Sequence, residues 1–249
     1  MKRLLLIVLP LLLIVGCSKP INDETLIEMG RLKYHPETKE LYSGEVFQNR
    51  MGGEKEFEGS YKDGKKDGVW ITWYENGQKK YERTYKDGEW DGLWTDWYEN
   101  GQKKEEGTYK DGKEDGKWTE WYENGQKKSE VTYKNGDRDG LITQWYENGQ
   151  KKSEVTYKNG EKDGKWTYWN ENGQKKNEET YKNGKRDGKW TFWFHNTGTK
   201  QYEVTFKDGT PDGKWTWWNE NGQKKREETY KDGELISKKE WNEDGSVKE

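Results

Sequence analysis

Apolar and polar positions follow one another along most of this chain in a pattern that returns every 24 residues. An aromatic residue followed by Lys, then Asp or Asn, then Gly marks each unit, with one inserted residue before the seventh mark. A repeat of this length, sustained over about eight units, predicts a stacked array, because no single unit can bury its apolar side chains alone. The marking residues are Tyr61, Tyr85, Tyr109, Tyr133, Tyr157, Tyr181, Phe206 and Tyr230.

Each unit predicts a β-hairpin. Two runs rich in aromatic and β-branched residues flank Asn124-Gly125 in one unit, and the same dipeptide recurs in five others. Asn-Gly favours a two-residue type I′ loop, in which both central residues have positive φ. The unit with Gly198 has one more residue and predicts a three-residue loop with this glycine in the left-handed region. A second turn, rich in Asp and Gly, joins each hairpin to the next, where these residues supply positive φ.

The hairpin register sorts the side chains onto two faces. With a two-residue loop, Trp118 faces Val131 on an apolar side, and Thr119 faces Glu130 on a polar side. The predicted fold is therefore all-β: an elongated, single-layer antiparallel sheet of repeated hairpins.

One tryptophan per unit falls on the polar side, where neighbouring copies recur about every 10 Å, since strands lie about 4.8 Å apart. Such a row can stack on sugar rings or hold a cationic headgroup. Alternatively, each indole is covered by the stem of its cross-strand lysine, as Lys128 would cover Trp121, and serves only stability. The second interpretation is favoured. The candidate binding residues are Trp73, Trp97, Trp121, Trp145, Trp169, Trp193 and Trp218.

The repeated sequence Tyr-Lys-Asp-Gly-Lys-x-Asp-Gly-x-Trp-x-x-Trp-Tyr-x-Asn-Gly resembles the bacterial variant of the MORN repeat, over roughly residues 41–249. The resemblance implies an elongated antiparallel sheet of successive hairpins. It says less about function, although the antitoxin-like proteins among its members make an antitoxin or immunity role one alternative.

Residues 1–16 are predicted to be a bacterial lipoprotein signal peptide. Lys2 and Arg3 precede an apolar run that is too short to span a bilayer stably. The sequence Ile14-Val15-Gly16-Cys17 resembles a lipobox, which implies that Cys17 becomes lipidated and anchors the chain to a membrane. An ordinary signal peptide with a chance cysteine, or an uncleaved anchor, are the alternatives.

The resemblance to lipoproteins implies a location in the bacterial cell envelope. Ser18 resembles an outer-membrane sorting position. Residues 17–40 are predicted to be the lipidated N-terminus and a tether, and residues 41–249 the repeat array.

Composition excludes several classes of protein. Charged residues make up 37% and hydrophobic residues 28%, which would favour disorder if sixteen tryptophans did not stand at fixed positions in the repeat. The net charge is −3, and Lys and Glu alternate on the same strands without a basic stripe. Nucleic acid is therefore not an expected partner.

The sequence predicts neither catalysis nor a cofactor. Its two histidines, His35 and His195, have no triad or metal-ligand partners at a suitable spacing. Asp63 and Asp67 lack the alternating ligands of a calcium loop and fit ordinary turn chemistry, so no metal site is predicted.

The predicted function is that of a non-catalytic, lipid-anchored repeat scaffold that mediates protein–protein interaction in the cell envelope. Glycan or lipid-headgroup binding through the tryptophan row is the alternative. Aromatic residues at one position of the apolar side increase toward the C-terminus, namely Tyr168, Phe192 and Trp217. A partner that binds the apolar side is therefore expected near the C-terminal end.

Overall fold

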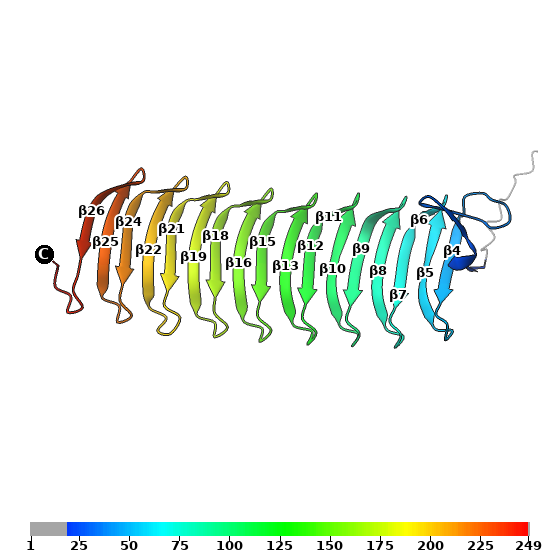
Figure 1. The fold of residues 1–249 in the computed structure, drawn as a ribbon, viewed down its shortest axis with the longest axis horizontal. Coiled ribbons are helices and arrows are strands. Elements are labelled where there is room, and N and C mark those ends of the chain that lie inside the picture. The colour runs from blue at the N-terminus through cyan, green and yellow to red at the C-terminus, as the bar shows by residue number, and fades with distance from the viewer. Residues whose placement is uncertain (1–18, 249) are drawn as a thin grey trace, which may run out of the picture.

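The computed structural model describes residues 19–248 of the protein. The predicted signal peptide, residues 1–16, and Cys17 lie outside the described residues. The described chain forms one long antiparallel sheet whose hairpins follow each other in sequence order along a single axis (Figure 1). The predicted all-β, single-layer array of repeated hairpins is confirmed.

Eight hairpins make up most of the sheet. Their strands are β4 (Gly44–Asn49) with β5 (Lys55–Lys62), β7 (Gly68–Trp73) with β8 (Lys79–Lys86), β9 (Glu89–Trp97) with β10 (Lys103–Lys110), β12 (Gly116–Trp121) with β13 (Lys127–Lys134), β15 (Gly140–Trp145) with β16 (Lys151–Lys158), β18 (Gly164–Trp169) with β19 (Lys175–Lys182), β21 (Gly188–Trp193) with β22 (Lys200–Lys207), and β24 (Gly213–Trp218) with β25 (Lys224–Lys231). Strand β26 (Glu234–Glu240) pairs with β25.

Shorter elements lie between and before the hairpins. Two-residue strands follow the connecting turns: β6 (Lys65–Lys66), β11 (Lys113–Glu114), β14 (Asp137–Arg138), β17 (Glu161–Lys162), β20 (Lys185–Arg186) and β23 (Thr210–Pro211). The N-terminal segment contains β1 (Ile21–Asn22), the 3-10 helix η1 (Asp23–Thr25), β2 (Ile27–Met29) and β3 (Leu32–Tyr34).

The hairpin loops differ from the predicted type I′ turn. In the Asn124-Gly125 loop only the glycine has positive φ, at 82°. The Gly125 N–H donates to the Tyr122 carbonyl at 2.9 Å, and the Tyr122 N–H donates to the Gln126 carbonyl at 2.8 Å. The loop therefore has three residues and ends in a left-handed glycine, a geometry that Asn-Gly also accommodates. The prediction of a two-residue loop was wrong.

This extra loop residue shifts the register at one position only. Trp118 pairs with Val131 and Thr119 with Glu130, as predicted, but a bulge follows and pairs Trp121 with Lys127 rather than Lys128.

The left-handed conformation of Gly198 is confirmed by its φ of 69°. The Phe194 N–H donates to the Thr199 carbonyl and encloses four loop residues. This loop is therefore one residue longer than predicted.

The type I′ pattern occurs instead in the turns that connect the hairpins. Asp111 and Gly112 have φ values of 49° and 76°, so both central residues are left-handed. Lys110 and Lys113 pair across this turn. The predicted role of Asp and Gly in supplying positive φ there is confirmed.

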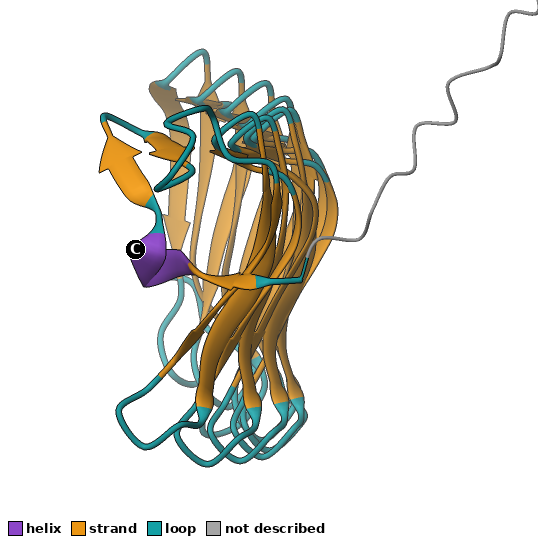
Figure 2. Ribbon diagram, turned by 90° about the vertical axis from the view of Figure 1, so that its right-hand side faces the viewer, coloured by secondary structure: helices purple, strands orange, loops and turns teal. Residues whose placement is uncertain are grey.

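The sheet is bowed, so its two faces differ. Seen along the array, all strands curve in the same sense, and η1 with the β2–β3 hairpin lies on the hollow side (Figure 2). We call this side, which carries Trp118, Glu120 and Val131, the concave face. The opposite side, which carries Thr119 and Trp121, is the convex face.

Aromatic rings form the core along the concave face. The ring of Trp118 lies 5.1 Å from that of Tyr109 and 6.2 Å from that of Tyr133. Its indole N–H donates to the Thr108 carbonyl at 3.2 Å, which satisfies the polar atom of a side chain that is only 6% exposed. Equivalent indole bonds occur in other units, at Trp70, Trp166, Trp190 and Trp215. Where Ile142 replaces the tryptophan, this ladder is interrupted.

The N-terminal segment is folded onto the array from Ile21 onward, although residues 17–40 were predicted to be the lipidated N-terminus and a tether. β1 pairs with β4 in parallel, with Ile21 opposite Val46. Leu26 and Tyr42 are buried in a cluster with Tyr61 and Trp70 of the first hairpins. These side chains cover the concave face at its N-terminal end, which explains why the segment folds back. We call residues 21–43 the strap.

Candidate functional site

The predicted tryptophan row lies on the convex face, and each of its seven members is half-buried. In six of them, a lysine of the preceding hairpin strand places its ammonium over the indole. Trp241 continues the row in the same way. The lysine nitrogens lie 5.0 to 5.9 Å from the ring centroids, in the pairs Lys55–Trp73, Lys79–Trp97, Lys127–Trp145, Lys151–Trp169, Lys175–Trp193, Lys200–Trp218 and Lys224–Trp241.

These lysines also bond a row of glutamates. Lys127 lies 2.5 Å and Lys117 2.7 Å from Glu130, and the same pair of contacts recurs around Glu178, Glu203 and Glu227. Beneath this layer Thr119 is only 8% exposed. The convex face is therefore a lattice of Lys, Glu, Trp and Thr in which a lysine covers the tryptophan of the next unit in every case except Trp121. Cover by the cross-strand Lys128 does not occur, because the bulge shifts the pairing.

The ion pairs with lysine lower the pKa values of several glutamates on the convex face. Burial alone would raise the pKa of Glu130, but its bonds to Lys117 and Lys127 outweigh burial and hold the pKa below its usual value. The same balance lowers the pKa values of Glu178 and Glu203. These carboxylates are therefore ionised and engaged at neutral pH.

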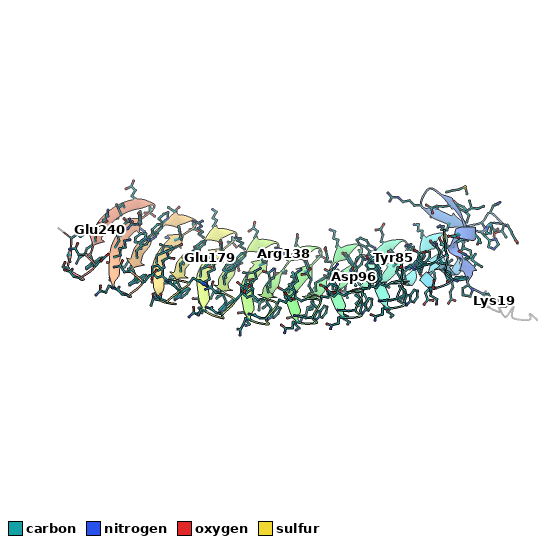
Figure 3. The ribbon with its side chains drawn as sticks, turned by 60° about the horizontal axis from the view of Figure 1, so that its bottom comes forward. Lys19, Tyr85, Asp96, Arg138, Glu179 and Glu240 are labelled. Carbon is teal, nitrogen blue, oxygen red and sulfur yellow. The ribbon has the colours of Figure 1, made fainter. Side chains whose placement is uncertain are left out.

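The concave face is the second candidate surface, and it runs the length of the array. Figure 3 labels residues along it from Tyr85 through Asp96, Arg138 and Glu179 to Glu240. The strap covers its N-terminal end. Beyond the strap, the central row of side chains changes from acidic to aromatic.

The acidic part spans three neighbouring strands. Glu105 stands directly opposite Asp96 on one side and Glu120 on the other. Arg83 lies 3.3 Å from Asp96, and Lys128 lies 3.4 Å from Glu120. Burial, followed by the charges of Glu120 and Asp96, raises the pKa of Glu105. Burial also raises the pKa of Asp96, despite the nearby Arg83. Sequence reasoning missed this group, because it depends on which strands become neighbours.

The aromatic part lies toward the C-terminus, where the structure places Tyr168, Phe192 and Trp217, all half-buried, in the same row of the concave face. Phe192 stacks on Tyr202 with 4.3 Å between ring centroids. The Arg226 guanidinium lies 3.9 Å from the Trp217 ring. This part of the concave face therefore combines aromatic rings with the guanidinium of Arg226.

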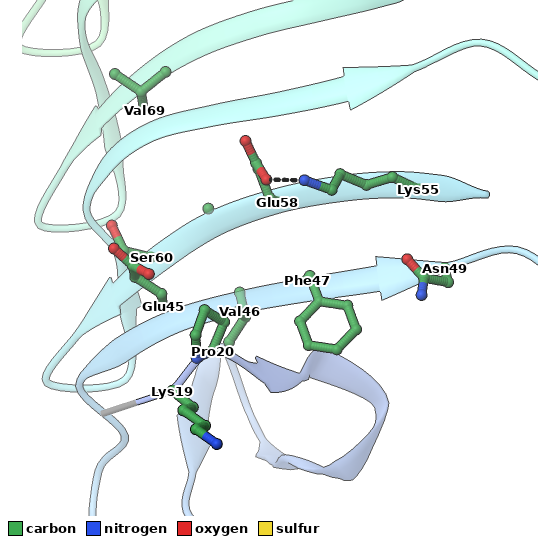
Figure 4. Close-up of a pocket in the computed structure, with 11 residues that line it drawn as sticks. Lys19, Pro20, Glu45, Val46, Phe47, Asn49, Lys55, Glu58, Ser60 and Val69 are labelled. Carbon is green, nitrogen blue, oxygen red and sulfur yellow. Dashed lines mark hydrogen bonds and ion pairs between the residues drawn. The ribbon is translucent and has the colours of Figure 1, made fainter. Parts of the chain in front are cut away.

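A separate hollow lies at the N-terminal end, beside β4 and β5 (Figure 4). Its volume is about 710 Å³, and Lys19 and Pro20 line it together with Phe47, Ser60 and Val69. The described chain therefore begins at the N-terminal edge of the array.

The remaining sequence candidates do not assemble into a reactive site. His35 stacks on Tyr42 within the strap, with 6.2 Å between the rings, and His195 lies in an exposed hairpin loop. Across residues 19–248, no cluster of three or more His, Cys, Asp or Glu side chains is arranged to hold a metal ion. Within the same range, none of the helical structure has the length and apolar character needed to cross a membrane.

The repeat geometry agrees with a comparison of the sequence with known families. The MORN repeat variant model matches six segments that together make up more than half of the chain: residues 66–87, 90–111, 114–135, 138–159, 162–183 and 211–232. The chain belongs to the MORN repeat variant family. Each matched segment begins at or near the short strand after a connecting turn, so the MORN repeat here is one hairpin with its turns. The stretch between the last two segments contains the longer loop around Gly198. No curated protein matches the chain.

Proposed function

We propose that this MORN-repeat protein is a non-catalytic scaffold that binds a protein partner along its concave face. The observation that carries the proposal is the row of half-buried aromatic rings at Tyr168, Phe192, Tyr202 and Trp217, which lies beyond the part of the concave face that the strap covers. At the other end of the same face, the strap buries Leu26 against Tyr61 and Trp70. The array thus already binds one polypeptide segment on this face, its own.

We also propose that lipidated Cys17 anchors the scaffold to a membrane of the bacterial cell envelope, in keeping with the lipobox-like sequence and with outer-membrane sorting. The described chain begins at the N-terminal edge of the array, at Lys19, two residues after this cysteine. Such an anchor would hold the N-terminal end of the array near the membrane and leave the aromatic part far from it.

Anchoring is tested by labelling cells with a fatty-acid analogue. The wild-type protein is expected to carry the label, and the Cys17→Ser variant is expected to lose it while its repeats still fold. An unlabelled wild-type protein would refute the anchor.

Partner binding is tested by capture from envelope extracts with the chain from Lys19 onward as bait. Replacing Phe192 and Trp217 by Thr is expected to abolish capture, whereas replacing Trp121 and Trp145 on the convex face is expected to leave it intact. The opposite result, together with binding on glycan arrays or lipid overlays, would favour recognition of glycans or headgroups by the tryptophan row.

A further inference from the structure

A small cavity in the concave face lies at a place where three other units hold a cation over their tryptophan and this unit does not. Its volume is about 120 Å³, and it lies beside β10, β12 and β13. Its walls include the rings of Tyr109, Trp118 and Tyr133 and the carboxylates of Glu105, Glu114 and Glu120.

Other units of the array show what can fill this position. In the short strand after each connecting turn, one residue pairs with the repeat's tyrosine, as Lys66 pairs with Tyr61. The Lys66 nitrogen lies 4.1 Å from the Trp70 ring centroid. Lys162 lies 4.2 Å from the Trp166 ring, and Arg186 lies 4.7 Å from the Trp190 ring. Three units thus place their own cation over their own tryptophan.

In the unit with the cavity, this position is Glu114, which pairs with Tyr109. Trp118, the tryptophan of the same unit, has no lysine or arginine of the described chain over its ring. The aromatic wall is kept while its cation is exchanged for a carboxylate. A ring face in such a position attracts a cation by its quadrupole.

The carboxylates increase this attraction. Glu105 stands between Asp96 and Glu120, and like charges that face each other across strands destabilise a sheet. Arg83 pairs with Asp96 and Lys128 with Glu120, while the part of the chain that the structure describes gives Glu105 no ion pair. A cation that enters the cavity would contact Glu105 and remove this repulsion.

We propose that this cavity binds the guanidinium group of an arginine presented by the protein partner. A guanidinium is planar, stacks on aromatic rings, and donates paired hydrogen bonds to carboxylates. A quaternary ammonium can use the rings but cannot donate to Glu105 or Glu120. The polypeptide source of the arginine rests on the proposed function of the concave face, whereas the guanidinium chemistry rests on the cavity alone.

The test uses ¹⁵N-labelled protein and follows the indole N–H resonance of Trp118, assigned with a Trp118→Phe variant. Ethylguanidinium is titrated at constant ionic strength, with tetramethylammonium and sodium as comparison cations. We expect ethylguanidinium to shift this resonance saturably, with a dissociation constant several-fold lower than that of tetramethylammonium. Equal behaviour of all three cations would overturn the proposal. The peptide acetyl-Gly-Arg-Gly-amide distinguishes the sources: tighter binding than ethylguanidinium indicates a peptide ligand, and equal binding a free guanidinium compound.

Three variants separate recognition from general charge. Glu114→Arg restores the cation found in other units, and is expected to raise the melting temperature and weaken ethylguanidinium binding at least about tenfold. Glu114→Gln removes the charge without supplying a cation and is expected to weaken binding less. Glu161, an exposed residue of β17, gives the matched control, because Glu161→Arg makes the same charge change away from the cavity and should leave binding unchanged. Equal losses in Glu114→Arg and Glu161→Arg would refute a specific site. Partner capture by the aromatic surface would be unaffected by that outcome.

Discussion

The hydroxyl of Tyr122 donates a hydrogen bond to the backbone carbonyl of Trp145, 2.8 Å away in the next unit. The same bond links the hairpins before and after it, from Tyr74 to Trp97, Tyr98 to Trp121 and Tyr146 to Trp169. This tyrosine ladder ties the loop end of each hairpin to its neighbour, where strand pairing has already ended. It stops at Asn170, whose buried side-chain amide nitrogen has no hydrogen-bond partner in the described chain.

The ladder predicts opposite effects at two equivalent positions. Tyr122→Phe removes one hydrogen bond and leaves the Trp145 carbonyl without its side-chain donor, so we expect a loss of about 1 kcal/mol in the free energy of unfolding. Asn170→Tyr replaces an unpaired buried amide and can extend the ladder to Trp193, so we expect a gain of about 1 kcal/mol. Urea unfolding of both variants measures the two changes. A destabilised Asn170→Tyr protein would contradict this account of the ladder.

The two faces predict unequal costs for the same substitution. Trp121→Thr and Trp145→Thr on the convex face should each cost about 1 kcal/mol, because both indoles are only half-buried; Trp145 also loses its contact with Lys127. Trp118→Thr and Trp166→Thr on the concave face should each cost about 3 kcal/mol or more, because those side chains are 6% and 4% exposed. The urea concentrations at the unfolding midpoints compare the four variants, provided that the dependence of the free energy of unfolding on urea concentration stays the same. Equal costs on both faces would show that the convex row belongs to the core.

The repeat predicts that whole units can be removed. Deleting residues 138–161 joins β14 to β17 at matching positions of the repeat, and should shorten the particle by about 10 Å without unfolding it, since two strand spacings are lost. Deleting only residues 138–149 removes half a unit. This deletion should disrupt the sheet, because the strands on either side of it can no longer pair in the register that keeps their apolar side chains on one face. Small-angle X-ray scattering measures the length, and circular dichroism serves as the folding control. An unchanged length after the first deletion would contradict additive stacking.

The carboxylates of Glu105 and Glu130 predict opposite effects of acid on stability. The pKa of Glu105 is raised in the folded state, so protonation favours folding as the pH falls toward its unfolded value of about 4.3. The pKa of Glu130 is lowered, so its contribution is present above about pH 4.3 and is lost as the pH falls through the folded value.

Glu105→Gln should therefore raise the melting temperature at pH 7, and the difference from wild type should vanish below about pH 4, where Glu105 is protonated in both states. Glu130→Gln should lower the melting temperature at pH 7, with a difference that also disappears in acid. Melting curves between pH 3 and 8 compare the three proteins. A Glu105→Gln protein that is less stable than wild type at pH 7 would show that this carboxylate has a favourable partner.

Residue types and their spacing determined the repeat, the hairpins and the two faces. Alternation placed Trp118 with Val131 and Thr119 with Glu130, because side chains of a strand point alternately to its two sides. The left-handed residues of the connecting turns, such as Asp111 and Gly112, also followed from sequence, since Gly and Asp tolerate positive φ at little cost, whereas the positive φ expected at Asn124 does not occur. The lipobox-like Cys17 stays a prediction.

The tertiary structure decided what depends on neighbouring units. Asn-Gly fits more than one loop, so only the folded hairpin fixed the bulge that pairs Trp121 with Lys127. The bond from Tyr122 to Trp145 spans 23 residues and requires the stacking of two hairpins. The placement of Glu105 between two other carboxylates likewise arises only when three strands come together. Sequence spacing specifies which face a side chain occupies, whereas the curvature and stacking of the sheet determine which distant side chains it contacts.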